Sequence, residues 1–137
     1  MRLFDFVYAH IYYWYYRMQM NGRKVEPQHY TTIAFVLWFA GLFLLIIRVH
    51  DLIFRPILHI NGLVVALAAL IAAGILREVY SRNDRYLKAF NKYTSNGQDA
   101  IKGKPIILAW LFILAPLALF AILLFVRTHP LLNYGEN

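Results

Sequence analysis

Three uncharged stretches, each opening on a proline, constrain this chain more than any other feature. They cover Pro27–Ile47, Pro56–Leu76 and Pro105–Val126, which are 21, 21 and 22 residues long. At about 1.5 Å of helical rise per residue, about 20 apolar residues match a hydrocarbon layer about 30 Å thick. Proline suits the first turn of a helix, where its missing N–H would have no partner. The stretches predict an all-α integral membrane protein with three transmembrane helices, over residues 30–47, 57–76 and 106–126.

The composition supports one small membrane domain. Hydrophobic residues make up 61% of the 137 positions and charged residues only 15%, far from the average of soluble proteins. The connections between the three stretches are too short for a second folded unit, so residues 1–137 are predicted to form a single domain. The chain has no cysteine, which excludes disulfides, thiol catalysis and cysteine-bound metal.

The distribution of basic residues predicts the orientation. Residues 1–26 and 77–104, which lie on one side of a three-span protein, carry eleven of the 14 lysines and arginines, and the other side carries three. Such a bias in short loops is typical of the cytoplasmic side. The N-terminus and residues 77–104 are therefore predicted to lie in the cytoplasm, with the C-terminus on the other side of the membrane.

Residues 1–20 are predicted to form an amphipathic helix lying flat at the cytoplasmic membrane surface. One helical face carries Leu3, Phe4, Val7, Ile11, Trp14, Tyr15 and Met18, and the opposite face carries Arg2, Asp5, Ala9, Tyr12, Tyr16 and Gln19. Tyrosine-rich amphipathic helices suit the headgroup region. Asp5 and Arg17 oppose a fourth span or a signal peptide. Gly22 is expected to end the helix.

The second span carries small residues on one side. Gly62, Ala66, Ala69 and Ala73 recur at spacings of four, three and four, and small residues let helix backbones approach closely. We expect this stripe to be the tightest packing surface, against a neighbouring span or another subunit. Asn61 is expected to donate a hydrogen bond to another helix or to reach the headgroups. Pro116 is expected to kink the third span.

The second span is predicted to continue into the cytoplasm as one helix to about residue 95. Two acid-before-base pairs at i, i+4 support it, Glu78 with Arg82 and Asp84 with Lys88. An aromatic arc lies on one side of this extension: Tyr80, Tyr86, Leu87, Phe90 and Tyr93. A basic arc lies on the other: Arg82, Arg85, Lys88 and Lys92. Together with Trp14 and Tyr15, these side chains are predicted to contact anionic lipid or a cytoplasmic protein partner, with both alternatives left open.

No catalytic or cofactor signature is visible. His50, His59, His129 and Asp51 map to the outer side but have no metal-ligand spacing, and no pair of histidines suits a haem. The spans contain no Asp, Glu, Lys or Arg, which counts against an ion-coupled transporter. We therefore predict a protein that is not an enzyme, with no cofactor, no metal and no nucleic-acid partner.

Three features carry a resemblance: the run Tyr12–Arg17 (YYWYYR), the three spans and the segment Tyr86–Tyr93 (YLKAFNKY). In these features the chain resembles small multi-span inner-membrane proteins of Bacteroidota. That resemblance implies the bacterial inner (cytoplasmic) membrane, with the C-terminus in the periplasm, and it carries no assigned activity. The predicted function is a non-catalytic accessory or assembly subunit of a larger energy-transducing, transport or secretion complex. The alternative is a homo-oligomeric pore or membrane-active effector.

Overall fold

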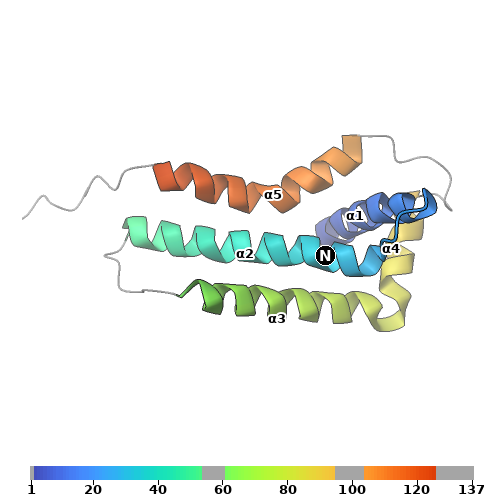
Figure 1. The fold of residues 1–137 in the computed structure, drawn as a ribbon, viewed down its shortest axis with the longest axis horizontal. Coiled ribbons are helices and arrows are strands. Elements are labelled where there is room, and N and C mark those ends of the chain that lie inside the picture. The colour runs from blue at the N-terminus through green and yellow to red at the C-terminus, as the bar shows by residue number, and fades with distance from the viewer. Residues whose placement is uncertain (1, 54–60, 95–103, 126–137) are drawn as a thin grey trace, which may run out of the picture.

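A computed structural model describes residues 2–53, 61–94 and 104–125 of the chain (Figure 1). Its elements are α1 (Arg2–Met20), α2 (Pro27–Ile53), α3 (Gly62–Ser81), the 3₁₀ turn η1 (Arg82–Asp84), α4 (Arg85–Thr94) and α5 (Lys104–Phe125). Within the described ranges the protein is all-helical, which confirms the predicted fold class.

Three of the helices are long and apolar enough to cross a membrane, and they are the predicted ones: α2, α3 with its continuation, and α5. Helix α2 exceeds the predicted span at both ends, because it starts at Pro27 and runs to Ile53. The predicted start of the second span at Ile57 lies outside the described residues. Asn61 precedes α3, and its Oδ1 accepts a hydrogen bond from the Leu63 N–H at 3.1 Å. Asn61 thus caps its own helix rather than donating to another.

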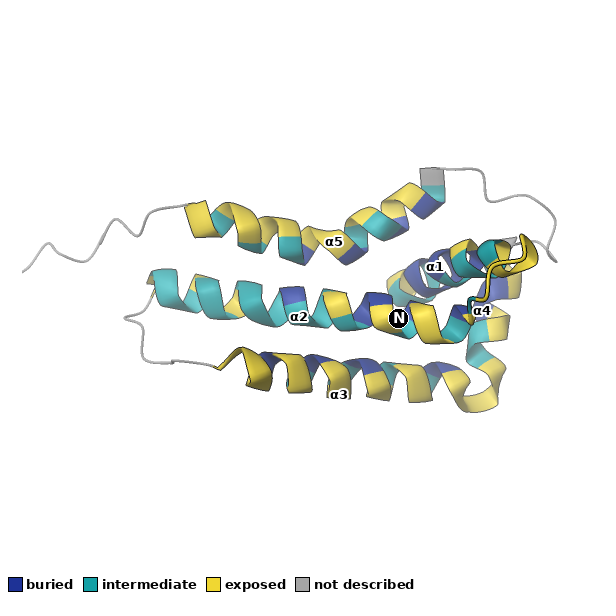
Figure 2. Ribbon diagram, in the orientation of Figure 1, coloured by how far each residue is buried: buried dark blue, intermediate teal, exposed yellow. Residues whose placement is uncertain are grey.

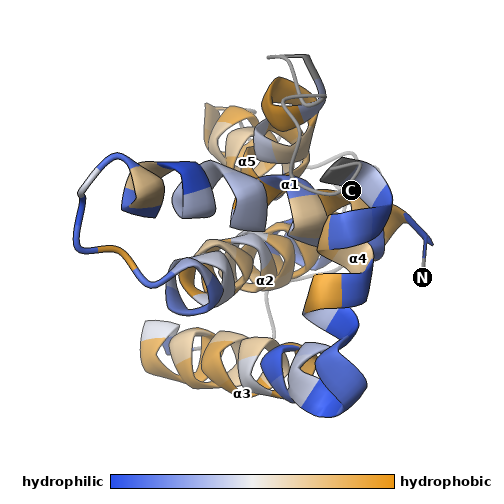
Figure 3. Ribbon diagram, turned by 90° about the vertical axis from the view of Figure 1, so that its right-hand side faces the viewer, coloured by the Kyte–Doolittle hydropathy of each residue, from blue (hydrophilic) through white to orange (hydrophobic). Residues whose placement is uncertain are grey.

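The three long helices form an open layer (Figures 1 and 3). Helix α2 lies in the middle and packs against both α3 and α5, whereas no contact joins α3 to α5 in the described part of the chain. Among the spans, each outer helix therefore packs against α2 alone. The rest of its surface is left for lipid or for another protein.

Helices α2 and α5 approach each other closely near the middle of α5. A Cβ atom added to Gly41 of α2 would lie 2.8 Å from Leu117 Cγ and 3.0 Å from the Leu117 backbone nitrogen. Leu117 directly follows Pro116, the proline inside α5, and Figure 1 shows α5 bending there as predicted. The N-terminal half of α5 then rises away from α2. Helices α2 and α5 are therefore close together at Gly41 and diverge toward the N-terminal end of α5.

Helix α1 fills this gap by crossing the end of the spans obliquely (Figures 1 and 3). The Phe4 ring contacts the rings of Phe35 and Trp38 on α2 at centroid distances of 6.2 and 5.5 Å. It also meets the ring of Phe112 on α5 at 6.1 Å. Helix α1 is therefore wedged between α2 and α5. Its aromatic rings fill the space where the bent α5 no longer contacts α2 directly.

The structure corrects the expectation that one face of α1 is wet, while the position of α1 at the membrane surface stays a prediction. The apolar residues Val7 and Ile11 are buried within the protein. On the supposed wet face, Ala9 is also fully buried and Tyr12 packs against Phe90 of α4. Because α4 covers the side of α1 that α2 and α5 leave free, the middle of α1 belongs to the core of the protein.

The predicted continuation of the second span is helical but not one uninterrupted helix. Asn83 and Asp84 adopt left-handed backbone conformations with φ of 55° and 50°, and α4 turns across the end of the spans (Figure 1). Asn and Asp tolerate this conformation better than other non-glycine residues. The expected Glu78–Arg82 pair forms at 3.3 Å. Asp84 lies before the start of α4, and no ion pair joins it to Lys88 within the described residues.

Candidate functional site

Side chains from α1, α3 and α4 meet around one carboxylate at the end of the spans. The Tyr80 hydroxyl donates to Asp5 Oδ1 at 2.6 Å. The Arg85 Nη2 lies 3.1 Å from Asp5 Oδ1 and 3.4 Å from Oδ2, and the guanidinium sits 5.3 Å above the centre of the Tyr80 ring. We call these three residues the Asp5 junction.

The local backbone explains why the Asp5 junction forms. Tyr80 occupies the last turn of α3 and is only 2% exposed, and Arg85 is the first residue of α4. The left-handed residues between them reverse the chain, so Arg85 returns over the Tyr80 ring. Asp5 enters from the first turn of α1. Because the ion pair is partly buried, removal of one partner would leave a poorly solvated charge.

An aromatic layer surrounds the Asp5 junction. Tyr8 and Tyr80 stack with ring centroids 4.1 Å apart and planes 1° from parallel. Burial raises the pKa of Tyr8, so its phenol stays protonated. Tyr8 Oη is buried and has no hydrogen-bond partner among the described residues. Tyrosine stacking of this kind fixes the end of α1 against the end of α3.

The aromatic arc that was predicted to face lipid or a cytoplasmic partner instead covers α1. Phe90 lies 5.4 Å from Tyr12 and 5.5 Å from Tyr16 between ring centroids. Tyr93 lies 5.6 Å from Phe6, and Tyr86 also packs against α1. Of the predicted arc, Leu87 is exposed. The arc is therefore an internal surface, and only the opposite side of α4 is open.

His10 is the buried histidine of α1. Its Nδ1 lies 2.6 Å from the Phe6 carbonyl oxygen, so this nitrogen carries the proton and donates. The imidazole lies 4.1 Å from the Phe6 ring and 5.6 Å from the Tyr93 ring. Burial lowers the pKa of His10 below its ordinary value. The neutral ring serves as a packed aromatic side chain.

The predicted basic arc divides into two kinds of residue. Arg82, Lys88 and Lys92 are exposed, and Figure 3 shows hydrophilic residues gathered over α4 and the turn before it. Arg85 instead belongs to the Asp5 junction and is not a free surface cation. A cavity of about 190 Å³ lies beside it, lined by Asp5, Arg85, Lys88, Ala89 and Lys92.

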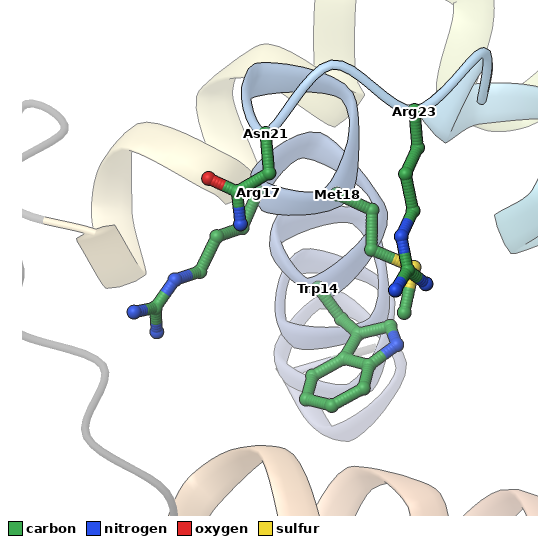
Figure 4. Close-up of a pocket in the computed structure, with 5 residues that line it drawn as sticks. All are labelled: Trp14, Arg17, Met18, Asn21 and Arg23. Carbon is green, nitrogen blue, oxygen red and sulfur yellow. The ribbon is translucent and has the colours of Figure 1, made fainter.

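Trp14 and Tyr15 lie in different surroundings, although both were predicted to face lipid or a partner. Tyr15 packs inside the protein, with ring centroids 5.3 Å from Tyr30 and 6.2 Å from Trp110. Trp14 is 39% exposed and lines a cavity of about 560 Å³ at the end of α1 (Figure 4). This cavity is larger than the one beside Arg85 and also contains two arginines.

The small-residue stripe of α3 packs within the chain over half its length. Ala69 and Ala73 are buried on the side of α3 that faces α2 (Figure 2). Gly62 and Ala66 are exposed, and a Cβ added to Gly62 would meet nothing within 4 Å. Val65 completes the buried face instead. A close backbone approach that was not predicted occurs at Gly41 of α2.

The outer histidines do not assemble a metal site in the described part of the chain. His50 lies 3.7 Å from its neighbour Asp51, while His59 and His129 fall outside the described residues. No group of three metal-ligating side chains occurs within the described ranges. Near His50 on α2, Arg48 Nε donates to the Leu123 carbonyl at 3.3 Å and so ties α2 to the last turn of α5.

A comparison of the chain with family models, curated proteins and solved structures found no match. The resemblance to small inner-membrane proteins of Bacteroidota therefore stays a prediction. The chemistry of the site has to be inferred from the chain itself. Its paired charges, stacked rings and neutral histidine hold helices together, and the two cavities can receive a ligand.

Proposed function

We propose that this protein is a non-catalytic accessory or assembly subunit of a larger complex in the bacterial inner membrane. The observation that carries the proposal is the open layer of α2, α3 and α5, in which α2 is the one span that contacts α3 within the described residues. The outer side of α3 includes small residues, and a Cβ added to Gly74 would meet nothing within 4 Å. Another helix can approach closely at such positions. The Asp5 junction gives the layer a rigid end.

The exposed sides of the spans favour a subunit over a homo-oligomeric pore. In the described parts of α3 and α5, every exposed residue from 62 to 76 and from 106 to 125 is apolar. A water-filled pore needs polar groups along its lining. Apolar surfaces suit contact with lipid or with another transmembrane helix.

Photocrosslinking in native membranes tests this proposal. A photoreactive amino acid in place of Leu70, which is 55% exposed on α3, should give one crosslinked product with a different, larger protein. The same group at buried Ala73 should react within the chain only. Products that contain only copies of this chain would favour the pore, and exclusive reaction with lipid would contradict the subunit proposal.

The proposed orientation places the end formed by α1 and α4 in the cytoplasm. Its support is the basic bias of residues 1–26 and 77–104. Single cysteines at Ser95 and Asn133, both outside the described residues, report on the two sides. A membrane-impermeant reagent should label Asn133→Cys in spheroplasts and should label Ser95→Cys only after lysis. Labelling of Ser95→Cys in intact spheroplasts would reverse the orientation.

A further inference from the structure

The cavity at the end of α1 combines an apolar floor with a cationic rim. Its volume is about 560 Å³, and its lining consists of Trp14, Arg17, Met18, Asn21 and Arg23 (Figure 4). Trp14 and Met18 supply apolar surface, and the other three supply hydrogen-bond donors. The described residues provide no acidic side chain to this lining. We call it the Trp14–Arg23 groove.

The backbone places Arg23 at the groove. Gly22 is left-handed, with φ of 81°, and its N–H donates to the Gln19 carbonyl at 3.0 Å. The Arg23 N–H donates to the Met18 carbonyl at 3.2 Å. These two bonds form a Schellman motif, which confirms Gly22 as the predicted helix end. The motif returns the chain over the end of α1, and Figure 4 shows the Arg23 side chain running beside Met18 toward the Trp14 ring.

Both arginines are available to a ligand. Arg17 and Arg23 are exposed, and within the described residues neither guanidinium has a hydrogen bond or an ion pair. In Figure 4 the Arg23 side chain approaches the Trp14 ring, whereas the Arg17 side chain leaves α1 on the other side and points away from the ring. The last carbonyls of α1 already accept bonds from Asn21, Gly22 and Arg23. An anion beside the Trp14 ring would therefore meet the Arg23 guanidinium, with the Arg17 charge farther along the groove. It would meet no free carbonyl at this helix end from residues 17 to 19.

We propose that the Trp14–Arg23 groove binds the phosphate of an anionic phospholipid headgroup. Arginine pairs with phosphate through parallel N–H···O bonds, and tryptophan favours the boundary between headgroups and acyl chains. The groove lies at the end of the spans, where α2 begins. The apolar floor accommodates the glycerol and first methylenes of the lipid, which a free phosphate ion would leave uncovered. This inference concerns a different surface from the α3 face of the proposed subunit and does not depend on it.

Native mass spectrometry of the full chain released from mixed nanodiscs tests the proposal. The nanodiscs contain equal amounts of phosphatidylglycerol and phosphatidylcholine. The unmodified protein should retain phosphatidylglycerol. The double variant Arg17→Gln with Arg23→Gln should lower the retained fraction roughly tenfold or more, because each basic residue near an anionic surface contributes to the binding free energy. The matched control is Arg2→Gln with Lys24→Gln, which removes the same charge from exposed residues outside the groove and should retain the lipid.

Three results would overturn the assignment. An equal loss in both double variants would show that only net charge attracts the lipid. Equal retention of phosphatidylcholine by the unmodified protein would show that the headgroup charge is not recognised. Displacement of the lipid by inorganic phosphate would assign the groove to the free ion.

Discussion

At the scale of single residues, Gly41 determines how closely two spans approach. The atoms that an added Cβ would meet include the Leu117 backbone nitrogen, which a side-chain rotation cannot move. Gly41→Ala should therefore push α2 and α5 apart and lower stability by about 1–3 kcal/mol. The matched control is Gly74→Ala, where the added Cβ meets open space and alanine favours the helix.

Thermal unfolding in a mild detergent measures the effect of both glycine variants. A clear drop in the unfolding midpoint for Gly41→Ala, with an unchanged or higher midpoint for Gly74→Ala, is the expected pair of results. Equal midpoints would show that α2 and α5 are not in contact at this position.

His10 makes stability depend on pH in a defined direction. Burial lowers the pKa of His10 in the folded protein below its ordinary value of 6.5. When the pH falls below that ordinary value, His10 is therefore protonated in the unfolded chain while it is still neutral in the folded protein. Stability should consequently fall as the pH drops from about 7.5 to about 5. His10→Gln, which has no titrating group, should lose less stability over the same interval. The unfolding midpoints of the two proteins at each pH check this, and an identical pH dependence would assign the loss to other groups.

At the scale of elements, the bend of α5 makes the space that α1 occupies. Pro116→Ala restores a backbone hydrogen bond within α5 and favours a straight helix. The gap should narrow, and amide hydrogen exchange in α1 should rise about tenfold. The control is Pro105→Ala, because a proline in the first helical turn displaces no intrahelical hydrogen bond. If exchange in α1 does not change in Pro116→Ala, the bend does not hold α1.

The elements also show what the sequence predicts well. The three spans, the proline at the start of α2, the bend at Pro116 and the glycine end of α1 follow from local rules about apolar length, proline and glycine. The break before α4 does not, since Asn83 and Asp84 are also tolerated in helices. Their left-handed conformation is compensated by the contact of Arg85 with Asp5, about 80 positions away in the chain.

At the scale of the whole molecule, the sequence predicts the amphipathic pattern of α1 but not what covers it. Lipid and protein offer equally apolar surroundings, so the stripe with Val7 and Ile11 is compatible with both. The burial of Ala9 on the opposite face depends on α4, and the position of α4 depends on the break at Asn83. The Asp5 junction is invisible in the sequence for the same reason, because its members share no local motif.

The central claim is that α1 is wedged between α2 and α5 as part of the protein core. Because the chain has no cysteine, paired cysteines give a clean crosslinking test. Phe4 and Phe112 face each other with ring centroids 6.1 Å apart, while their neighbours Leu3 and Leu111 are both exposed.

A short bifunctional thiol reagent in native membranes should join Phe4→Cys to Phe112→Cys within one chain and should not join the control pair Leu3→Cys and Leu111→Cys. After cleavage of the chain between α1 and α5, Tris-tricine gels show whether the crosslink still holds the two fragments together. Failure of the first pair to crosslink, or equal crosslinking of both pairs, would contradict the wedged position of α1.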